Sequence, residues 1–193
     1  RSRRPDVILD EVKSLLDEGY KEITLLGQNV DSYNYEGVKF KDILEGVTKI
    51  DGKFRLRFMT SHPKDFDSEV IDIIRSCDNI CNNVHLPVQS GSNRVLKLMN
   101  RKYTREKYFD IISEIREKLP ECGITSDIMV GFPTETDEDF ADTLDLVKKV
   151  RFSNAFTFVY SPRKGTPAAA MEQLPAAVKK QRITELVNLQ NAI

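Results

Sequence analysis

The chain lacks the features that mark membrane and secreted proteins. No apolar run approaches the roughly 18 residues that a membrane-spanning helix requires. No charged segment followed by an apolar one opens the sequence, as it would in a secretory signal. The three cysteines are odd in number and too few for a disulfide framework in 193 residues. These absences predict a cytoplasmic protein in a reducing compartment.

Further absences narrow the fold and the partners. The net charge is only -1, so no overall basic field indicates nucleic-acid binding. Neither a phosphate-binding loop nor G-x-G-x-x-G follows the first predicted strand, which weakens a nucleotide-binding doubly wound sheet. What is present is an ordinary globular composition, 40% hydrophobic and 31% charged. The length suits one domain with a substantial core.

Both ends of the chain are unusual. The sequence begins Arg-Ser-Arg-Arg without methionine and ends inside an amphipathic, helix-like segment. We therefore expect residues 1–193 to be one domain excised from a longer protein.

Helical spacing of apolar residues alternates with short apolar runs along the chain. Helices are predicted over residues 6–19 and 39–50, around 70–74, over 92–119 in two pieces, from 136 onward and after 175. Strands are predicted over residues 22–27, 53–60, 83–88, 124–132 and 155–160. One helix followed by five strand–helix pairs is typical of parallel strands with right-handed crossovers. Both faces of the strands look apolar, as if covered by helices, and a doubly wound sheet and a barrel both fit this order.

Polar or glycine-rich segments follow the five predicted strands. They are GQNVDSY (27–33), TSHP (60–63), QSGS (89–92), GFPTET (131–136) and YSPRKGTP (160–167). Ligands of parallel α/β folds bind at the carboxyl ends of the strands, and glycines let the backbone approach them closely. The predicted rim suits a polar small molecule with a ribose and an amino-acid-like end. No serine or cysteine has a motif-supported histidine partner, so we predict no nucleophile–base pair.

The spacing of Cys77, Cys81 and His85 would place all three on one face of a helix. A strand predicted from Asn83 onward removes His85 from that face, and no fourth zinc ligand is evident. We predict no metal site here, with the thiols packed near a helix end. His62 and His85 are interpreted as hydrogen-bonded structural residues.

Basic residues concentrate in one short region of the sequence. They are Arg94, Lys97, Arg101, Lys102, Arg105 and Lys107. The pattern fits either a solvated helix face or a surface that contacts phosphates.

Long stretches of the chain resemble a known family. TLLGQNVDSY, TSHP, HLPVQSGSNRVLKLMNRKYT, DIMVGFPTETDEDF and YSPRKGTPAA closely resemble the radical S-adenosylmethionine (SAM) methylthiotransferases, and within them the branch that acts on tRNA. The resemblance runs from residue 1 to about residue 190. It implies an α/β fold, a partial (β/α)6 TIM-like barrel of the radical SAM type from which the first strand and the cluster loop are missing.

The resemblance also implies an activity. Members of this family bind a [4Fe–4S] cluster through a C-x3-C-x2-C loop, cleave SAM to a radical, and add a methylthio group to N6-isopentenyladenosine beside the anticodon. The implied partners are the tRNA anticodon stem-loop and an electron donor protein, with no membrane. An N-terminal domain with a second cluster and a C-terminal RNA-binding domain are expected in the full-length protein and absent from this chain. No C-x3-C-x2-C occurs here, since the residue three positions after Cys81 is Val84. Because thiolates are needed to hold the iron, we expect the chain alone to be inactive.

The resemblance assigns SAM contacts to motif positions and no catalytic residue or metal ligand to this chain. The expected SAM-binding residues are Gly27, Gln28, Asn29, Ser61, Gln89, Ser90, Ser92, Asp127, Gly131, Glu135, Phe158, Tyr160 and Ser161.

Other functions stay open at this point. Methylthiotransferases of this family also act on other tRNA adenosines or on a ribosomal protein. A metabolic barrel enzyme such as a Schiff-base aldolase needs a lysine inside a strand, and only Lys53, at a strand start, is available. A non-catalytic module that binds RNA with its basic face is a further alternative.

Overall fold

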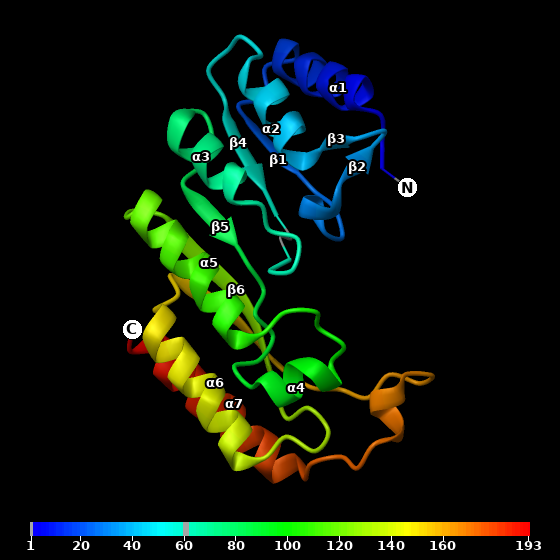
Figure 1. Cartoon of the computed structure of the whole chain (residues 1–193), viewed down its shortest axis with the longest axis vertical. Coiled ribbons are helices and arrows are strands. Elements are labelled where there is room, and N and C mark those ends of the chain that lie inside the picture. The colour runs from blue at the N-terminus through cyan, green and yellow to red at the C-terminus, as the bar shows by residue number, and fades with distance from the viewer. Residues whose placement is uncertain (1, 60–61) are drawn as a thin grey trace. The chain divides into compact units, whose positions relative to one another are not determined.

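The computed structural model describes residues 2–59 and 62–193 (Figure 1). The chain divides into two compact units. The first unit contains Arg1–His85 and Ser113–Gly123, and the second contains Leu86–Ile112 and Ile124–Ile193. In each unit helices pack against parallel strands.

The first unit begins on a helix and then alternates strands and helices. Its elements are α1 (Pro5–Asp17), β1 (Glu22–Leu25), the 3-10 helix η1 (Val30–Ser32), β2 (Asn34–Tyr35), β3 (Val38–Lys39), α2 (Phe40–Thr48), β4 (Arg55–Phe58), α3 (Ser68–Ser76) and β5 (Asn83–His85). Strands β1 and β4 pair in parallel, with Glu22 opposite Arg55 and Leu25 opposite Phe58. The carboxyl end of β1 therefore leads directly into the GQNVDSY segment.

Apolar faces of α2, α3 and the strands make the core of the first unit. The rings of Phe40 and Phe58 meet edge to face with their centroids 5.3 Å apart. Helix α1 approaches α2 closely because Gly46 has no side chain: a Cβ there would lie 3.0 Å from the Leu9 side chain. Leu44, Val47 and Leu56 are fully buried.

The second unit holds the remaining helices and the longest strand. Its elements are α4 (Asn93–Leu98), the first part of α5 (Arg105–Lys118), β6 (Gly123–Val130), α6 (Asp137–Val150), β7 (Asn154–Val159), the 3-10 helix η2 (Pro167–Ala170) and α7 (Ala176–Asn191). Strands β6 and β7 pair in parallel from Thr125 opposite Asn154 to Val130 opposite Val159. The backbone of Gln89 also lies along β6: its N–H donates to Asp127 O (2.8 Å), and its carbonyl accepts from Met129 N–H (2.9 Å).

The predicted helices and strands are confirmed, with boundaries shifted by a few residues. Thr136 caps α6 as expected, since its hydroxyl accepts from Asp139 N–H and the Asp139 carboxylate accepts from Thr136 N–H. Parallel pairing is confirmed as well. Within residues 2–59 and 62–193 the paired strands stay in open sheets, as expected of a partial barrel rather than a closed one.

The short hairpin of β2 and β3 was not predicted. Glu36 and Gly37 both have positive φ (51° and 93°), as the two central residues of a tight hairpin turn require. The strands pair over only two residues each, too few for a periodic apolar pattern.

The prediction that both faces of every strand are covered is wrong for β7. Phe156 and Phe158 lie on the same face of this strand, and their side chains are 47% and 50% exposed. The other face packs against α7. Successive side chains point to opposite faces of a strand. The apolar residues of β7 occur on both faces, which predicted that both faces are covered, but one face is open.

Cys77 lies at a helix end, as expected, and Cys81 lies beyond it. Helix α3 ends at Ser76 and Cys77 is its cap. The chain then returns to the sheet: Leu56 N–H donates to Asn79 O (2.7 Å), and Cys81 N–H donates to Leu56 O (2.9 Å). These sheet bonds compete with helix continuation. The three cysteines, Cys77, Cys81 and Cys122, are free thiols.

Among the described residues, no helix is long and apolar enough to cross a membrane.

Candidate functional site

The predicted SAM-binding residues fall on both units, and each unit is described by itself. Gly27, Gln28 and Asn29 belong to the first unit. Gln89, Ser90, Ser92, Asp127, Gly131, Glu135, Phe158, Tyr160 and Ser161 belong to the second. Ser61 lies outside the described residues.

In the first unit, the loop after β1 presents polar groups that its own fold does not fully use. Gly27 and Gln28 are exposed, and Asn29 is half-buried. The Asn29 side-chain amide donates to Asp65 Oδ2 at 2.8 Å. Its Oδ1 is buried and accepts no hydrogen bond from the described residues. Since a buried acceptor without a partner costs free energy, this oxygen suits a ligand that carries an N–H donor.

The same loop borders a hollow of about 790 Å³ in the first unit. Its lining is partly apolar, from Val12, Leu15 and Ile23, and partly polar, from Gln28 and Asn29. A hollow that combines apolar walls with convergent polar groups can hold a polar small molecule. The loop therefore combines the space and the hydrogen-bonding groups that a polar ligand needs.

In the second unit, one face of the β6–β7 pair carries the predicted ligand-facing side chains. Asp127 lies opposite Phe156, and Met129 lies opposite Phe158, so these four share a face. The structure thus brings Asp127 and Phe158 together on adjacent strands. A carboxylate beside exposed aromatic rings offers both hydrogen bonding and stacking to a nucleoside-like ligand.

Tyr160 follows β7 directly and packs at the carboxyl edge of the sheet. Its ring packs edge to face on Phe132 with centroids 5.1 Å apart. The Lys179 ammonium lies 5.3 Å from the Tyr160 ring centroid and donates to Tyr160 O at 3.3 Å. The Tyr160 hydroxyl is buried and has no hydrogen-bond partner among the described residues. Ser161, which follows, is exposed.

The QSGS segment behaves differently, because it packs into its own unit. Ser90 and Ser92 are buried, and Ser92 Oγ donates to Asp139 Oδ1 at 2.6 Å. Gly91 N–H donates to Thr143 Oγ1 at 3.0 Å. A Cβ on Gly91 would lie 2.5 Å from Asp142 O, so only glycine fits against α6 at this point. Gln89, at φ 67°, is the half-buried member of the segment.

Asp139 is the centre of this internal network. Burial alone would raise the pKa of its carboxyl. Hydrogen bonds from Arg94, Ser92 and Thr136 outweigh that effect and hold the pKa below its usual range. The carboxylate therefore stays ionised and joins α4 to α6.

The GFPTET segment is also held from within. Glu135 Oε1 accepts from Gly131 N–H (3.0 Å) and from the Arg182 guanidinium (2.7 Å). Arg182 donates further to Glu135 O (3.0 Å) and to Asp137 Oδ1 (2.7 Å). The side chains of Arg182 and Glu135 are only 6% and 1% exposed. Arg182 of α7 thereby fixes the loop that follows β6.

The pKa of Glu135 reflects its burial. Desolvation raises the pKa of this carboxyl, while the bonds from Gly131 and Arg182 oppose the rise. Gly131 has φ 72°, and a Cβ there would lie 2.7 Å from Lys179 Cγ. The segment is thus a closely packed turn whose polar groups bond to one another.

The described residues do not fit an iron–sulfur cluster. Among them no group of three or more histidine, cysteine or acidic side chains is placed to hold a metal ion. Cys122 is buried, which raises the pKa of its thiol and disfavours the thiolate that iron requires. His62 Nδ1 accepts from Lys64 N–H at 3.2 Å, as a structural histidine would.

Several residues that shape these loops were missed in the sequence. Arg182 and Thr143 lie in helices and match no motif. Neither Tyr103, which lies inside the segment HLPVQSGSNRVLKLMNRKYT, nor Tyr108 was assigned a role in these loops. Tyr103 and Tyr108 donate their hydroxyls to Val88 O and Leu86 O, both at 2.9 Å. Burial raises the pKa of Tyr103 to about 12. Only the capping pattern Thr136-x-x-Asp139 was visible as a signal, and it indicates a helix start rather than a loop anchor.

Comparison with known proteins extends over most of the chain. The profile of the radical SAM superfamily matches residues 1–147. A protein of Desulforamulus reducens named tRNA-2-methylthio-N(6)-dimethylallyladenosine synthase is 56% identical over 196 residues, covering 100% of this chain and 43% of the relative. Proteins of the same name from Moorella thermoacetica and Clostridium botulinum (strain Loch Maree) are 53% and 56% identical, again over 100% of this chain and 44% of each relative. The chain thus spans less than half the length of the curated relatives it matches.

Solved structures share the fold at low sequence identity. Coproporphyrinogen III oxidase of Escherichia coli superposes with a TM-score of 0.69 at 19% identity, over 95% of this chain and 44% of that enzyme. The radical S-adenosylmethionine methyltransferase TsrM of Kitasatospora setae gives 0.70 at 18% identity, over 86% and 33%. The α/β architecture with parallel strands is therefore that of radical SAM enzymes.

Proposed function

We propose a function from one established premise: the chain belongs to the radical SAM superfamily. The proposal is that it forms the SAM-binding core of a tRNA methylthiotransferase that adds a methylthio group to N6-isopentenyladenosine beside the anticodon. The observation that carries it is the 53–56% identity, over the whole chain, to proteins named as that synthase.

Groups in each unit are suited to parts of SAM. In the first unit, the buried Asn29 Oδ1 is an acceptor for an ammonium group, and Gln28 adjoins it at the edge of the hollow. In the second unit, Phe158 and Tyr160 offer aromatic surface for adenine, and Asp127 offers a carboxylate to hydroxyl groups. Bound SAM supplies the radical and the methyl group. This chain's part is to bind and orient it.

The buried members of the predicted set support the site indirectly. Four of these residues form hydrogen bonds within the second unit and hold the backbone of the loops that follow residue 89 and β6. They are Ser90, Ser92, Gly131 and Glu135. We propose that they position the ligand-facing residues.

The rest of the activity belongs to the full-length protein. Because the described cysteines do not fit a cluster, we propose that the [4Fe–4S] ligands lie outside this chain. The proposal includes a second, cluster-binding domain, an RNA-binding domain, an electron donor protein and a cytoplasmic location alongside tRNA. The free thiols Cys77, Cys81 and Cys122 agree with a reducing compartment.

The experiment is complementation. The full-length protein is expressed in a bacterial strain whose tRNA lacks the methylthio group, and tRNA nucleosides are analysed by mass spectrometry. We expect the 2-methylthio form of N6-isopentenyladenosine to appear. A soluble protein that leaves this nucleoside unmodified, in a strain that a characterised synthase restores, would overturn the proposal.

Mass spectrometry in the same experiment separates the alternative substrates, and a second experiment tests the alternative reaction. A methylthio group on a different tRNA adenosine, or on a ribosomal protein seen in intact-protein mass spectra, would replace the proposed substrate while retaining the reaction. A Schiff-base barrel enzyme would instead be trapped by borohydride with a carbonyl substrate.

A further inference from the structure

We propose that Lys97, Lys102, Arg163 and Lys164 of the second unit bind the phosphate backbone of RNA. We call these four residues the basic rim. The inference rests on the proposed function and deepens it, because it names the surface of this chain that holds the substrate RNA.

The first observation is a local separation of charge. Residues 86–105 contain five basic residues and no acidic one, and residues 151–171 contain three basic residues and no acidic one. The chain as a whole is nearly neutral, at -1. The excess of positive charge is therefore confined to these two segments. Such a local positive surface is of the kind that binds phosphates.

Some basic side chains of these segments form ion pairs within the unit, and others do not. Arg94 forms an ion pair with Asp139, and Arg105 forms ion pairs with Asp142 and Asp145, so both arginines join their segments to α6. For these two residues the phosphate-contacting interpretation is unnecessary.

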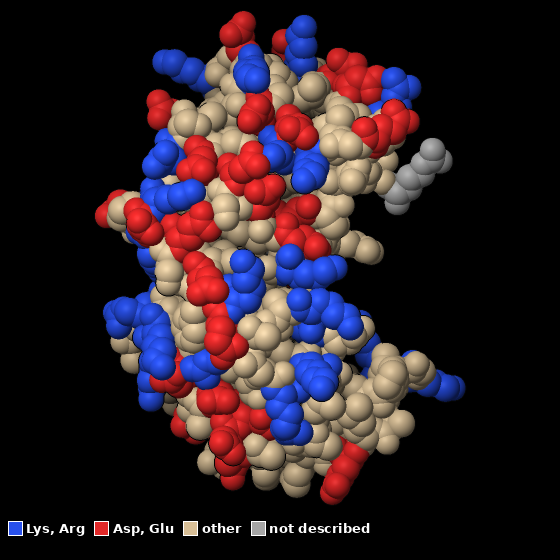
Figure 2. Space-filling model, viewed as in Figure 1, with Lys and Arg blue, Asp and Glu red and all other residues tan. Residues whose placement is uncertain are grey.

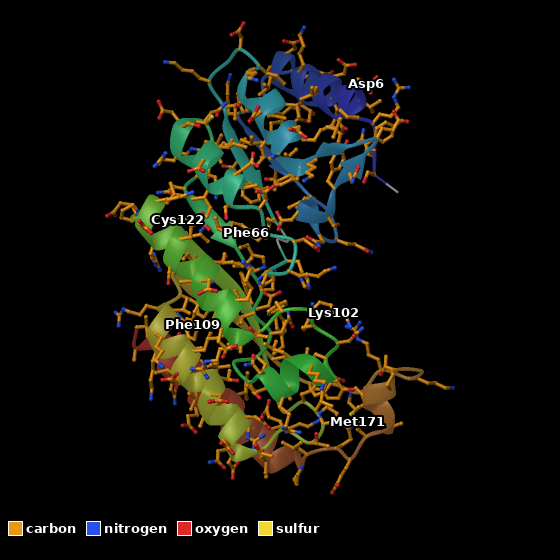
Figure 3. The ribbon with its side chains drawn as sticks, in the orientation of Figure 1. Asp6, Phe66, Lys102, Phe109, Cys122 and Met171 are labelled. Atoms are coloured by element: carbon orange, nitrogen blue, oxygen red, sulfur yellow. The ribbon has the colours of Figure 1, made fainter. Side chains whose placement is uncertain are left out.

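The basic rim is different. Lys97, Lys102, Arg163 and Lys164 are all exposed. Within the part of the chain that the structure describes, none of them has a carboxylate at ion-pair distance. Their charges are therefore available to a partner. Figure 2 shows basic side chains gathered over α4 and the loop that follows it, and Lys102 extends from that loop in Figure 3.

Lys97 lies in helix α4, and ordered turns carry Lys102, Arg163 and Lys164. The loop after α4 is held by the buried Tyr103, whose hydroxyl donates to Val88 O. It is also held to α4 itself, because Arg101 N–H donates to Leu96 O at 2.9 Å. The turn after β7 closes on itself, since both Thr166 N–H and its hydroxyl donate to Arg163 O. Cations held on ordered turns lose less conformational entropy on binding than cations on free loops.

Both turns follow the carboxyl edge of one sheet. Gln89 pairs with β6, and β6 pairs in parallel with β7, so the segments after Gln89 and after Val159 leave the same edge. Two strand spacings separate their strand ends by about 10 Å. The exposed rings of Phe156 and Phe158 lie on the adjoining strand face. Cations around exposed aromatic rings are typical of surfaces that bind unpaired nucleic acid, where bases stack and phosphates pair with basic groups.

The test uses the full-length protein and an unmodified tRNA transcript. Affinity is measured by fluorescence anisotropy over a range of salt concentrations for two double variants, Lys97→Ala with Lys102→Ala and Arg163→Ala with Lys164→Ala. The matched control is Lys148→Ala with Lys149→Ala. These exposed lysines lie in the last turn of α6, at the opposite edge of the sheet.

For each rim variant we expect the slope of log K against log salt to fall by roughly 1.4 to 1.8, because each phosphate contact contributes about 0.7 to 0.9. The same relation predicts a loss of affinity of roughly 20- to 60-fold near 0.1 M salt. The control variant should keep the wild-type affinity and slope.

The outcomes distinguish this inference from the proposed function. Wild-type binding with unchanged affinity and slope in both rim variants would overturn the basic rim and leave the proposed function intact. Equal losses in rim and control variants would also overturn it, because they would show only a general charge effect. A wild-type protein that binds no tRNA would overturn both.

Discussion

The loop after β1 and the loops after Gln89 and β6 use similar residues in opposite ways. In the first unit, Asn29 keeps a buried acceptor without a partner beside a hollow. In the second unit, Ser92 and Glu135 are buried and bonded to Asp139 and Arg182. The first loop keeps an acceptor that the proposed ligand would use, and the other loops use their polar groups within their own fold.

This difference shows that the polar segments after the strands contain two kinds of residue: those left available to a ligand and those that bond within the fold. Polar side chains at the carboxyl ends of strands were all expected to face a ligand. Some of these side chains are buried and hold the loop backbone through hydrogen bonds within the unit. The open face is formed by neighbouring residues such as Asp127 and Phe158. Substitutions in the two regions should therefore affect different quantities: stability in the loops after Gln89 and β6, and ligand binding in the loop after β1.

The largest expected effect is on stability, from Arg182→Met. This change leaves the buried Glu135 carboxylate without its guanidinium partner. Breaking a buried ion pair costs about 3–5 kcal/mol in free energy of unfolding. Chemical denaturation followed by circular dichroism measures the loss.

Lys180→Met is the matched control, because Lys180 is an exposed residue of the same helix α7. It should change the free energy of unfolding by no more than about 0.5 kcal/mol. A loss below about 1 kcal/mol in Arg182→Met would show that Glu135 finds other partners, and the contrast between the loops would weaken.

An intermediate effect, with a defined pH dependence, is expected for Asp139→Asn. Hydrogen bonds to a charged group are worth about 1.5–3 kcal/mol each, so we expect a loss of about 2 kcal/mol at neutral pH. The folded pKa of Asp139 lies below its unfolded value of about 3.9. Its contribution is therefore complete above that value and declines as the pH falls toward the folded pKa.

Denaturation of both proteins between pH 3 and pH 7 checks this prediction. The difference in unfolding free energy should be constant above about pH 5 and should shrink below about pH 4. A difference that instead grew on acidification would contradict an ionised Asp139 in the network.

The smallest effect on stability is expected for Asn29→Ala. The lost bond to Asp65 is worth about 0.5–1.5 kcal/mol, and the buried acceptor without a partner is removed at the same time, which offsets the loss. Binding of SAM by the full-length protein, measured by equilibrium dialysis, should nevertheless weaken about tenfold or more. Asn82→Ala, at an exposed position of the first unit, should leave both quantities unchanged. Unaltered SAM binding in Asn29→Ala would remove the ligand role from this loop.

Much of the fold could be predicted because its signals are local. The apolar spacing of α2, the cap at Thr136 and the short runs of β4 and β6 each lie within a few residues of one another. The hairpin of β2 and β3 and the return of residues 79–81 to the sheet could not be predicted. The first is too short for a period, and the second results from pairing of residues 79–81 with β4.

By itself, the sequence determined the order of helices and strands and the parallel arrangement, and it indicated the segments in which ligand-binding groups are proposed. These follow from periodicity, capping and family motifs, all of which are written in contiguous residues. Only the tertiary structure decided which polar groups face outward. Ser92 and Glu135 are each satisfied by a residue 47 positions away, Asp139 and Arg182. Whether a buried polar group is already paired depends on contacts that no local pattern contains.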